Sequence, residues 1–314
     1  MSEAVGSGLA LVFPGQGSQF VGMGRDLYDS SDVGRQVFEE ADRVLGFSLS
    51  RLCFEGPEEE LVDTLNAQPA IVATSAAFWM ALKERLGGSL MPAFVAGHSL
   101  GEYSALLAAG ALDLPTVLRL VRERGRVMKE AGAREPGAMA AVLGMGADAL
   151  RSICREVGEV WLANDNSPNQ IVLSGKKSAL EQALKLASER GARRTIPLAV
   201  TIASHSPLMQ PAADAFAATV SDLTLHDARL PIVANVSAAP VTKVEDLRDE
   251  MLRQLTSSVR WVESVRNMIT AGVGTFVEIG PKNTLTRLIN QIDQNVRALT
   301  VGNVAELEAL RMDG

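Results

Sequence analysis

The sequence is poor in the residues that mark several large classes of protein. Of its 314 residues only 2 are cysteine, 4% are aromatic, and the formal net charge is −7. Cys53 and Cys154 lie in unrelated contexts with no second pair, so we expect reduced thiols and neither a disulfide framework nor a metal site. The acidic balance argues against nucleic acid as the main partner.

Long hydrophobic runs are missing too. The longest apolar stretch, residues 69–82, spans about 14 residues and is interrupted by Thr74 and Ser75, which suits a buried helix and is too short to cross a bilayer. Pro69 should lie in the first turn of that helix, where its missing N–H costs nothing. Residues 1–8 have no basic segment followed by an apolar run, as a signal peptide would. We therefore expect a cytoplasmic protein with no membrane partner.

One short segment organises the rest of the chain. Apolar residues 93–96 lead into Gly-His-Ser-Leu-Gly at 97–101, and an Ala- and Leu-rich run follows at 104–109. This pattern predicts a strand, a sharp turn with Ser99 at its apex, and a helix whose N-terminus faces the serine oxygen. The flanking glycines allow the strained backbone that such a turn requires. The segment favours a serine nucleophile, although the glycines could also merely punctuate a strand–helix turn.

The order of the predicted elements indicates two α/β units. Residues 137–198 read strand, helix, strand, strand, helix, strand, which is the βαββαβ order of a ferredoxin-like unit. We expect this small domain to span 133–198 and to be inserted into a large catalytic domain formed by 1–132 and 199–314. The large domain should be α/β-hydrolase-like, with a short parallel sheet that carries the serine turn.

A serine nucleophile needs a base, and the chain has only 3 histidines. His98 adjoins Ser99 at the sharp turn, where consecutive side chains point in different directions, and His226 lies in a polar stretch typical of the surface. His205 precedes a proline-started helix and follows the small domain, from which a loop can reach back over the large sheet. By elimination His205 is the predicted base, the alternative being a structural histidine. No Asp or Glu is obviously placed to orient it, so a backbone carbonyl or a neutral amide would hold its tautomer.

Several separated motifs occur together and in order. They are Phe-Pro-Gly-Gln-Gly-Ser-Gln at 13–19, Gln-Pro-Ala at 68–70, Gly-His-Ser-Leu-Gly-Glu-Tyr-Ser at 97–104, Arg-Gly at 124–125, the segment 164–170, and Ser-His at 204–205. In these motifs the chain resembles the malonyl-CoA:acyl carrier protein transacylases of bacterial fatty acid synthesis. It resembles polyketide synthase acyltransferase domains more distantly.

The resemblance implies an enzyme that moves a malonyl group from malonyl-CoA to the thiol of acyl carrier protein through an acyl-serine. It assigns catalysis to Ser99, His205 and Gln254, of which Gln254 would hold the histidine ring largely through its carbonyl. The backbone N–H groups of Gln16 and Leu100 would form the oxyanion hole. No metal and no cofactor is implied, because the coenzyme A thioester is itself a substrate.

The resemblance also implies a substrate pocket. Arg124 would clamp the free carboxylate of malonate, because a guanidinium can make two parallel charge-assisted hydrogen bonds. Gln68, Asn164 and Gln170 match positions that line the pocket. Without the family context, Arg124 reads as a solvated charge on a basic helix face and the segment 164–170 as a polar hairpin turn.

Alternatives stay open at this point. Ser204 stands where many malonyl-selective relatives have Phe, whereas Leu100 favours malonyl over methylmalonyl. The resemblance does not separate a fatty acid enzyme from a free-standing acyltransferase of a polyketide pathway. A serine thioesterase or esterase would need an acid for His205 and no arginine clamp. A catalytically silent carrier-binding module would not need Ser99, His205 and Arg124 all intact.

Acyl carrier proteins are acidic, so an acidic enzyme needs a locally basic docking face. Between residues 151 and 194 the chain carries eight Arg and Lys against five Asp and Glu, a local charge of +3. We expect the carrier to dock near Lys176, Lys177, Arg193 and Arg194, although a solvated helix face gives the same pattern.

Overall fold

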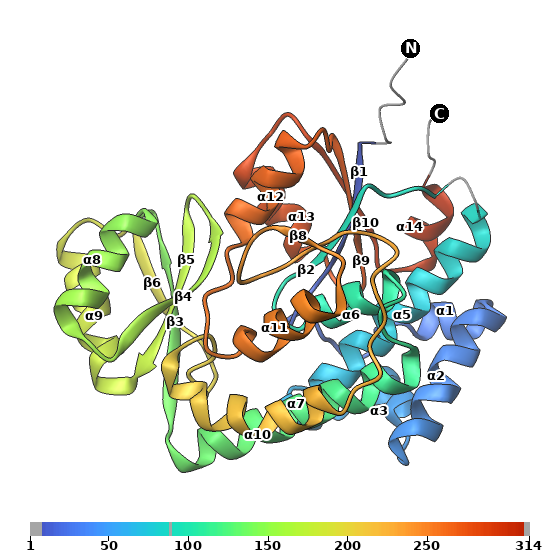
Figure 1. Ribbon diagram of the computed structural model, residues 1–314, viewed down its shortest axis with the longest axis horizontal. Coiled ribbons are helices and arrows are strands. Elements are labelled where there is room, and N and C mark those ends of the chain that lie inside the picture. Colours follow the sequence, from blue (N-terminus) through green and yellow to red (C-terminus); the bar gives the residue numbers. More distant parts are fainter. Residues whose placement is uncertain (1–7, 88–89, 311–314) are drawn as a thin grey trace.

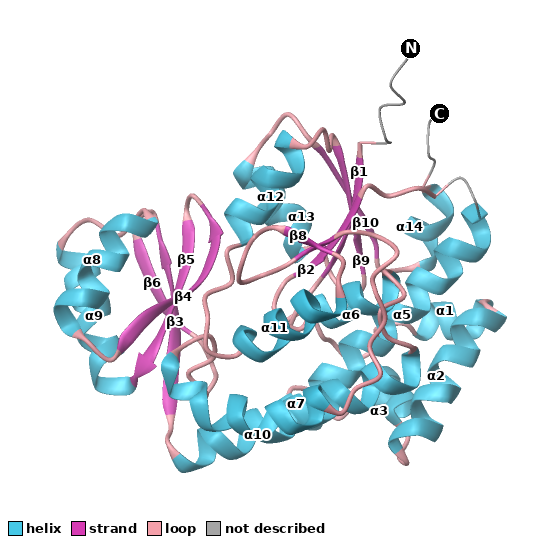
Figure 2. Cartoon of the chain, viewed as in Figure 1, coloured by secondary structure: helices cyan, strands magenta, loops and turns pink. Residues whose placement is uncertain are grey.

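Two β-sheets with helices packed on them organise the chain (Figure 1; Figure 2). The computed structural model describes residues 8–87 and 90–310. The larger sheet has the strand order β10-β9-β1-β2-β7-β8, and the smaller has the order β4-β5-β3-β6. The fold is therefore mixed α/β.

Parallel strands form the centre of the larger sheet. β1 (Leu9–Phe13) pairs in parallel with β2 (Phe94–Gly97) on one side and with β9 (Thr275–Ile279) on the other. Outside them lie the parallel strands β10 (Arg297–Val301) and β7 (Ile232–Val233), and an antiparallel edge strand, β8 (Pro240–Val241). Because parallel strands end at the same edge of a sheet, the loops after β1, β2 and β7 lie next to one another.

Alternation along β1 explains why helices cover both faces of this sheet. Leu11 and Phe13 point into the larger core, whereas Ala10 and Val12 point into a second core on the opposite face. The larger core is formed mainly by α2 (Asp32–Leu45), α5 (Thr64–Leu86), α6 (Gly101–Ala108), α7 (Leu114–Arg134) and α10 (Gln210–Ser221), and the second by α12 (Trp261–Thr270) and α13 (Thr284–Ile292). Further helices complete the unit: α1 (Arg25–Ser30), α3 (Leu49–Glu55), α4 (Glu58–Leu61), α11 (Val244–Gln254) and α14 (Val304–Ala309).

The start of α5 differs from the sequence prediction. We expected Pro69 in the first turn, but the helix begins at Thr64 and Pro69 lies inside it. Asp63 caps the helix, because its side chain accepts a hydrogen bond of 3.0 Å from the backbone N–H of Leu65. The capping and the burial of the helix outweigh the N–H that proline lacks. Within 8–87 and 90–310, no helix is both long and apolar enough to span a bilayer.

The smaller sheet belongs to one continuous segment of the chain. Its elements follow the predicted order: β3 (Gly137–Leu143), α8 (Ala147–Val157), β4 (Val160–Ser167), β5 (Gln170–Lys176), α9 (Lys177–Glu189) and β6 (Arg194–Pro197). All of its strand pairs are antiparallel. Figure 1 shows α8 and α9 on the side of this sheet that faces away from the rest of the molecule.

Edge strand β4 joins the small unit to the large one. The backbone N–H of Val259, in the loop after α11, donates to the carbonyl of Ala163 at 2.8 Å, and the N–H of Asp165 donates to the carbonyl of Val259 at 2.9 Å. Ser167 also donates to the side chain of Gln291 at 2.8 Å. The loop after α11 therefore extends the small sheet by one short bridge, which covers part of its edge.

Candidate active site

The turn after β2 has the strained geometry that its sequence predicts. Ser99 has a φ of 52°, in the left-handed region that non-glycine residues rarely adopt. A Cβ on Gly97 would lie 2.0 Å from the carbonyl oxygen of Gly101, and one on Gly101 would lie 2.0 Å from the carbonyl oxygen of Phe13. Both glycines are therefore required, because α6 begins in direct contact with the ends of β1 and β2.

Ser99 and His205 form a hydrogen-bonded pair. Ser99 Oγ lies 2.8 Å from His205 Nε2, although the two residues are 106 positions apart. His205 Nδ1 faces two backbone carbonyls, of Gln254 at 3.0 Å and of Ser257 at 3.1 Å. Carbonyl oxygens only accept hydrogen bonds, so the proton of a neutral ring belongs on Nδ1 and the lone pair of Nε2 faces the serine hydroxyl. The sequence prediction that a carbonyl would hold this tautomer agrees with these contacts.

Burial keeps the imidazole neutral. His205 is only 4% exposed, and its burial, with the nearby positive charge of Arg124, lowers its pKa to about 3. At neutral pH the ring is therefore ready to accept a proton.

Arg124 brings a buried positive charge to the same point. It projects from α7, is 1% exposed, and its Nη2 donates to Ser99 Oγ at 3.3 Å and to Gln254 Oε1 at 3.0 Å. Its Nη1 donates to Gln68 Oε1 at 2.9 Å, and its guanidinium carbon lies 5.4 Å from the centre of the Tyr103 ring. Burial lowers the pKa of this guanidinium. Within the described residues no carboxylate forms an ion pair with Arg124, so neutral groups alone hold a cation suited to bind an anion.

A chain of side chains connects Arg124 to the loop after β1. Gln68 Nε2 donates to Thr64 Oγ1 at 3.0 Å, and Thr64 Oγ1 donates to Gln16 Oε1 at 3.2 Å. A Cβ on Gly15 would lie 2.4 Å from the carbonyl oxygen of His98, so this loop runs directly against the serine turn.

The two N–H groups expected in the oxyanion hole lie at this junction. Gln16 follows β1 and Leu100 follows Ser99, and β1 and β2 end side by side where Phe13 pairs with Gly97. Within 8–87 and 90–310, neither backbone N–H donates a hydrogen bond to a protein acceptor. Both remain available to a ligand oxygen, as an oxyanion hole requires.

Two residues predicted to line the pocket do not join this network. Asn164 lies in β4, is 6% exposed, and forms the backbone bridge to Val259. Gln170 begins β5 opposite Leu143 and Ser167. In the part of the chain that the structure describes, neither side chain is hydrogen-bonded to Ser99, His205 or Arg124.

The four residues of the expected docking face fall into two pairs at opposite ends of β3. Lys176 pairs with Gly137 and Arg194 pairs with Leu143, so they flank opposite ends of β3, about 20 Å apart along the strand. Lys177 begins α9 directly after Lys176, and Arg193 directly precedes Arg194 at the start of β6. The two pairs lie apart because α9 carries the chain back along the sheet between them. Lys176 is also engaged in an ion pair with Glu159.

Comparison with known proteins then gives the family. Residues 10–308 match the acyl transferase domain. The malonyl CoA-acyl carrier protein transacylase of Bacillus subtilis (strain 168) is 45% identical over 306 residues, covering 96% of each chain, and that of Escherichia coli (strain K12) is 40% identical over 303 residues, covering 96% of this chain and 97% of the other. The chain belongs to the malonyl CoA-acyl carrier protein transacylase family.

Solved members of this family have the same fold. An acyl carrier protein S-malonyltransferase from Vibrio cholerae is 41% identical, with a TM-score of 0.93 over 97% of this chain and 100% of the other. A malonyl-transacylase solved in complex with its type II PKS acyl-carrier protein is 42% identical, with a TM-score of 0.92 over 96% of this chain and 97% of the other.

Sequence reasoning missed three residues at this transacylase site. Ser257 gives His205 its second carbonyl, and Asn166 Oδ1 lies 2.7 Å from Nε2 of His98. The side chain of Asn235 accepts a hydrogen bond from the backbone N–H of Ser99. A polar residue just after a parallel strand was the available signal for Asn235, whereas nothing local marks a residue that contributes only its carbonyl.

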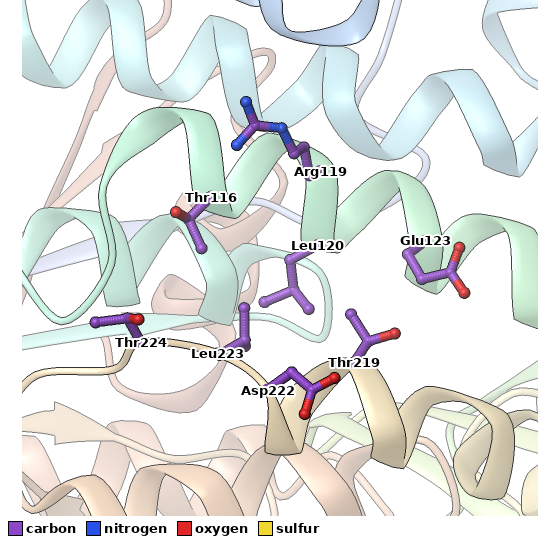
Figure 3. A pocket seen from close by; sticks show the side chains of 8 residues that line it. All are labelled: Thr116, Arg119, Leu120, Glu123, Thr219, Asp222, Leu223 and Thr224. Atoms are coloured by element: carbon purple, nitrogen blue, oxygen red, sulfur yellow. The ribbon is translucent and has the colours of Figure 1, made fainter.

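A separate groove lies outside this transacylase site. It has a volume of about 640 Å³ and lies between α7 and the C-terminal end of α10 (Figure 3). Leu120 and Leu223 contribute apolar surface, and Arg119, Glu123 and Asp222 contribute charges of both signs. Ser99, His205 and Arg124 are not among its lining residues, so the groove is not part of the site.

Proposed function

We propose that this protein transfers the malonyl group of malonyl-CoA to the phosphopantetheine thiol of acyl carrier protein, for fatty acid synthesis, through a malonyl-Ser99 intermediate. The observation that carries the proposal is the position of Ser99 Oγ, 2.8 Å from His205 Nε2 and 3.3 Å from Nη2 of the buried Arg124. A nucleophile beside its base explains acyl transfer, and a buried cation beside both explains an acyl group that carries a carboxylate. The solved complex of a 42% identical relative with an acyl-carrier protein supports the identity of the acceptor.

In the first half-reaction Ser99 attacks the thioester. His205 Nε2 accepts the hydroxyl proton as the oxygen forms a bond to the thioester carbon, and the carbonyl electron pair moves onto its oxygen. The N–H groups of Gln16 and Leu100 stabilise that oxyanion. When the C–S bond breaks, the imidazolium returns its proton to the sulfur of coenzyme A. In the second half-reaction the carrier thiol gives its proton to His205 and attacks the malonyl ester, and Ser99 leaves with that proton.

Arg124 selects the acyl group and assists the base. The malonyl carboxylate replaces the neutral groups that now hold the guanidinium, with two charge-assisted hydrogen bonds. Because the positive charge of Arg124 lowers the pKa of His205, a bound carboxylate that compensates this charge raises it. The same substrate group therefore anchors the acyl chain and makes the base stronger.

The domain organisation follows the same proposal. The parallel strands around Ser99 support an α/β-hydrolase-like catalytic domain, residues 1–132 and 199–314. The proposal also includes a cytoplasmic location and no cofactor. The strand order β4-β5-β3-β6 supports a ferredoxin-like inserted domain, residues 133–198, although α7 continues to Arg134 across that boundary. Carrier docking on the inserted domain is tested by reversing the charge of Lys176 and Lys177 separately from that of Arg193 and Arg194. Charge reversal of the pair that contacts the carrier should raise the KM for the carrier and leave the KM for malonyl-CoA unchanged.

The decisive experiment is incubation with malonyl-CoA alone, followed by mass spectrometry of the peptide that contains Ser99. We expect one malonyl group on Ser99 and one equivalent of free coenzyme A. Continuous release of coenzyme A without a carrier would indicate a thioesterase, and no labelling would indicate a silent carrier-binding module. Repeating the labelling with methylmalonyl-CoA measures the preference between the two acyl groups.

Arg124→Ala tests the carboxylate clamp. Loss of a buried charge-assisted pair costs about 3–5 kcal/mol, so malonyl transfer should fall by about 10²-fold or more, while neutral acyl groups enter more easily. Arg126→Ala is the matched control, because Arg126 lies on the same helix but faces solvent and pairs with Glu123 and Glu130. Near wild-type malonyl transfer by Arg124→Ala would refute the clamp.

A further inference from the structure

The ladder between β2 and β7 stops just before the serine turn. The paired residues are Val95 with Ile232 and Ala96 with Val233. Asn235 lies two residues beyond the end of β7 and is 1% exposed. Its side chain makes two hydrogen bonds to the turn, accepting from the N–H of Ser99 through Oδ1 at 2.6 Å and donating through Nδ2 to the carbonyl of Gly97 at 2.6 Å.

These two bonds have the pattern of a parallel ladder. In such a ladder, a residue that lies opposite residue i accepts a hydrogen bond from the N–H of residue i+1 and donates one to the carbonyl of residue i−1. Asn235 does this on either side of His98, but with its carboxamide in place of a backbone peptide group. The spacing agrees as well, because Val95 N–H donates to the carbonyl of Pro231 and, four residues further along both segments, Ser99 N–H donates to Asn235.

Asn235 is itself held at both backbone ends. Its N–H donates to Glu102 Oε2, in the first turn of α6, at 2.7 Å, and its carbonyl accepts from the N–H of Arg260 at 3.0 Å. Glu102 follows Ser99 by only three residues, so the serine turn is enclosed by a closed loop of hydrogen bonds. The carboxamide therefore has little freedom to move away from Ser99.

We propose that Asn235 is a positioning residue, whose carboxamide continues the β2–β7 ladder around the serine turn and holds Ser99 in its left-handed conformation. The bond also consumes the N–H of Ser99, which leaves the N–H of Leu100 as the donor at the turn that faces the substrate oxygen. The link to acyl transfer rests on the proposed function, whereas the orientation of Ser99 does not depend on it.

The experiment compares three variants by the rate at which Ser99 reacts. Asn235→Ala removes both bonds, and Asn235→Asp keeps an acceptor but lacks a donor for Gly97 while ionised. The matched control is Ser264→Ala, which removes an equally buried hydroxyl. This hydroxyl donates to the carbonyl of Arg260, near the loop that contains Asn235, but it makes no hydrogen bond to the serine turn. Rates are measured as the burst of coenzyme A release from malonyl-CoA and as labelling by a fluorophosphonate, each normalised to the number of reactive serines. Labelling does not require malonyl transfer, so it separates a failure of this proposal from a failure of the proposed function.

We expect Asn235→Ala to slow both reactions by about 10²-fold, as a small displacement of a nucleophile does, with the KM for malonyl-CoA almost unchanged. Ser264→Ala should keep the wild-type rate per reactive serine. Asn235→Asp should be slow at neutral pH and recover as the pH falls, because a protonated carboxyl donates to Gly97 and accepts from Ser99 as the amide does. A wild-type rate in Asn235→Ala, an equal loss in Ser264→Ala, or no acid recovery in Asn235→Asp would each overturn the proposal.

Discussion

The two partners of the Ser99–His205 hydrogen-bonded pair are held in different ways. Ser99 sits on a turn from which α6 begins in contact with the ends of β1 and β2, and the side chain of Asn235 bonds to this turn at Gly97 and Ser99. His205 is held by two backbone carbonyls about 50 residues further along, one at the end of α11 and one in the loop after it, and that loop is bonded to the small sheet. Both residues have a positive φ, of 52° and 59°. The comparison teaches that a strained conformation can be held by close packing together with a distant side chain, as at Ser99, or by distant backbone carbonyls, as at His205.

The two sides also differ in charge. The nucleophile side contains the positive charge of Arg124 and the buried carboxyl groups of Glu102 and Glu250. The ring of His205 is oriented by neutral carbonyls alone, without the carboxylate that many serine hydrolases use. The charge that adjusts the base therefore comes from the substrate-binding side.

The largest expected effect comes from breaking the nucleophile side with Gly101→Ala. The new Cβ would lie 2.0 Å from the carbonyl oxygen of Phe13, which is backbone and cannot move aside cheaply. We expect a loss of more than about 3 kcal/mol in the free energy of unfolding, and no transfer activity. Gly146→Ala is the control, because nothing lies within 4 Å of its added Cβ and its φ is −75°. Urea unfolding of both variants measures the difference, and equal stability would contradict the packing argument.

The next effect concerns the buried carboxyl of Glu102. Burial and the proximity of Glu250 raise its pKa to about 8, from 4.5. The folded state therefore binds this proton more tightly than the unfolded chain does, and its contribution to stability is complete below pH 4.5 and lost as the pH rises towards 8. The slope is up to about 1.4 kcal/mol per pH unit. Urea unfolding between pH 5 and 8 should show a flatter profile for Glu102→Gln, and identical slopes in both proteins would contradict it.

The base side predicts an unusual pH profile. A histidine with its ordinary pKa of 6.5 would lose about tenfold in kcat/KM at pH 5.5, whereas His205, with a pKa of about 3, stays neutral there. We expect the burst of coenzyme A release to keep its rate to pH 5.5, and an acid limb centred near 6.5 would count against this. Because the folded state binds this proton more weakly than the unfolded chain, His205 also reduces stability as the pH falls from 6.5 towards 3.

The smallest expected effect is a difference in kcat between two matched substitutions, Gln254→Ala and Ser257→Ala. Gln254 and Ser257 both give a backbone carbonyl to His205, but only the Gln254 side chain also contacts the nucleophile side, where its Nε2 donates to the carbonyl of Ser99 at 3.1 Å. Gln254→Ala should lower kcat by about tenfold or more, because it removes the side-chain hydrogen bonds to the carbonyl of Ser99 and from Arg124. Ser257→Ala keeps the carbonyl and should change kcat by less than about twofold. Equal changes of kcat in the two variants would contradict a special contribution of the Gln254 side chain.

Local patterns explain the features that were predictable. The pentapeptide at 97–101 predicts the serine turn because the glycines, the strained residue and the helix start are adjacent in the chain. The βαββαβ order of the small unit was readable for the same reason, since periodicity reports each strand and helix separately. The family prediction, which the comparisons confirm, combined several such segments in order.

Features that depend on which segments meet were less predictable. Pro69 alone predicts that α5 starts just before it, whereas the cap at Asp63 starts the helix at Thr64. The expected docking residues lie near one another in sequence, but α9 carries the chain between them, so they form two pairs at opposite ends of β3, and carrier docking there stays a prediction. The position of Asn235 just after a parallel strand marks it as a candidate site residue but does not show that it contacts Ser99, and nothing local marks the contact of Ser257 with His205.

The amino-acid sequence by itself determined the strained serine, its glycines, the three histidines from which the base was chosen, and the order of the elements. Only the tertiary structure decided that a buried arginine meets the serine, that two carbonyls hold the histidine, and that an asparagine completes the ladder. The reason is physical: backbone conformation follows from neighbours along the chain, whereas burial, pKa and hydrogen-bond partners follow from neighbours in space.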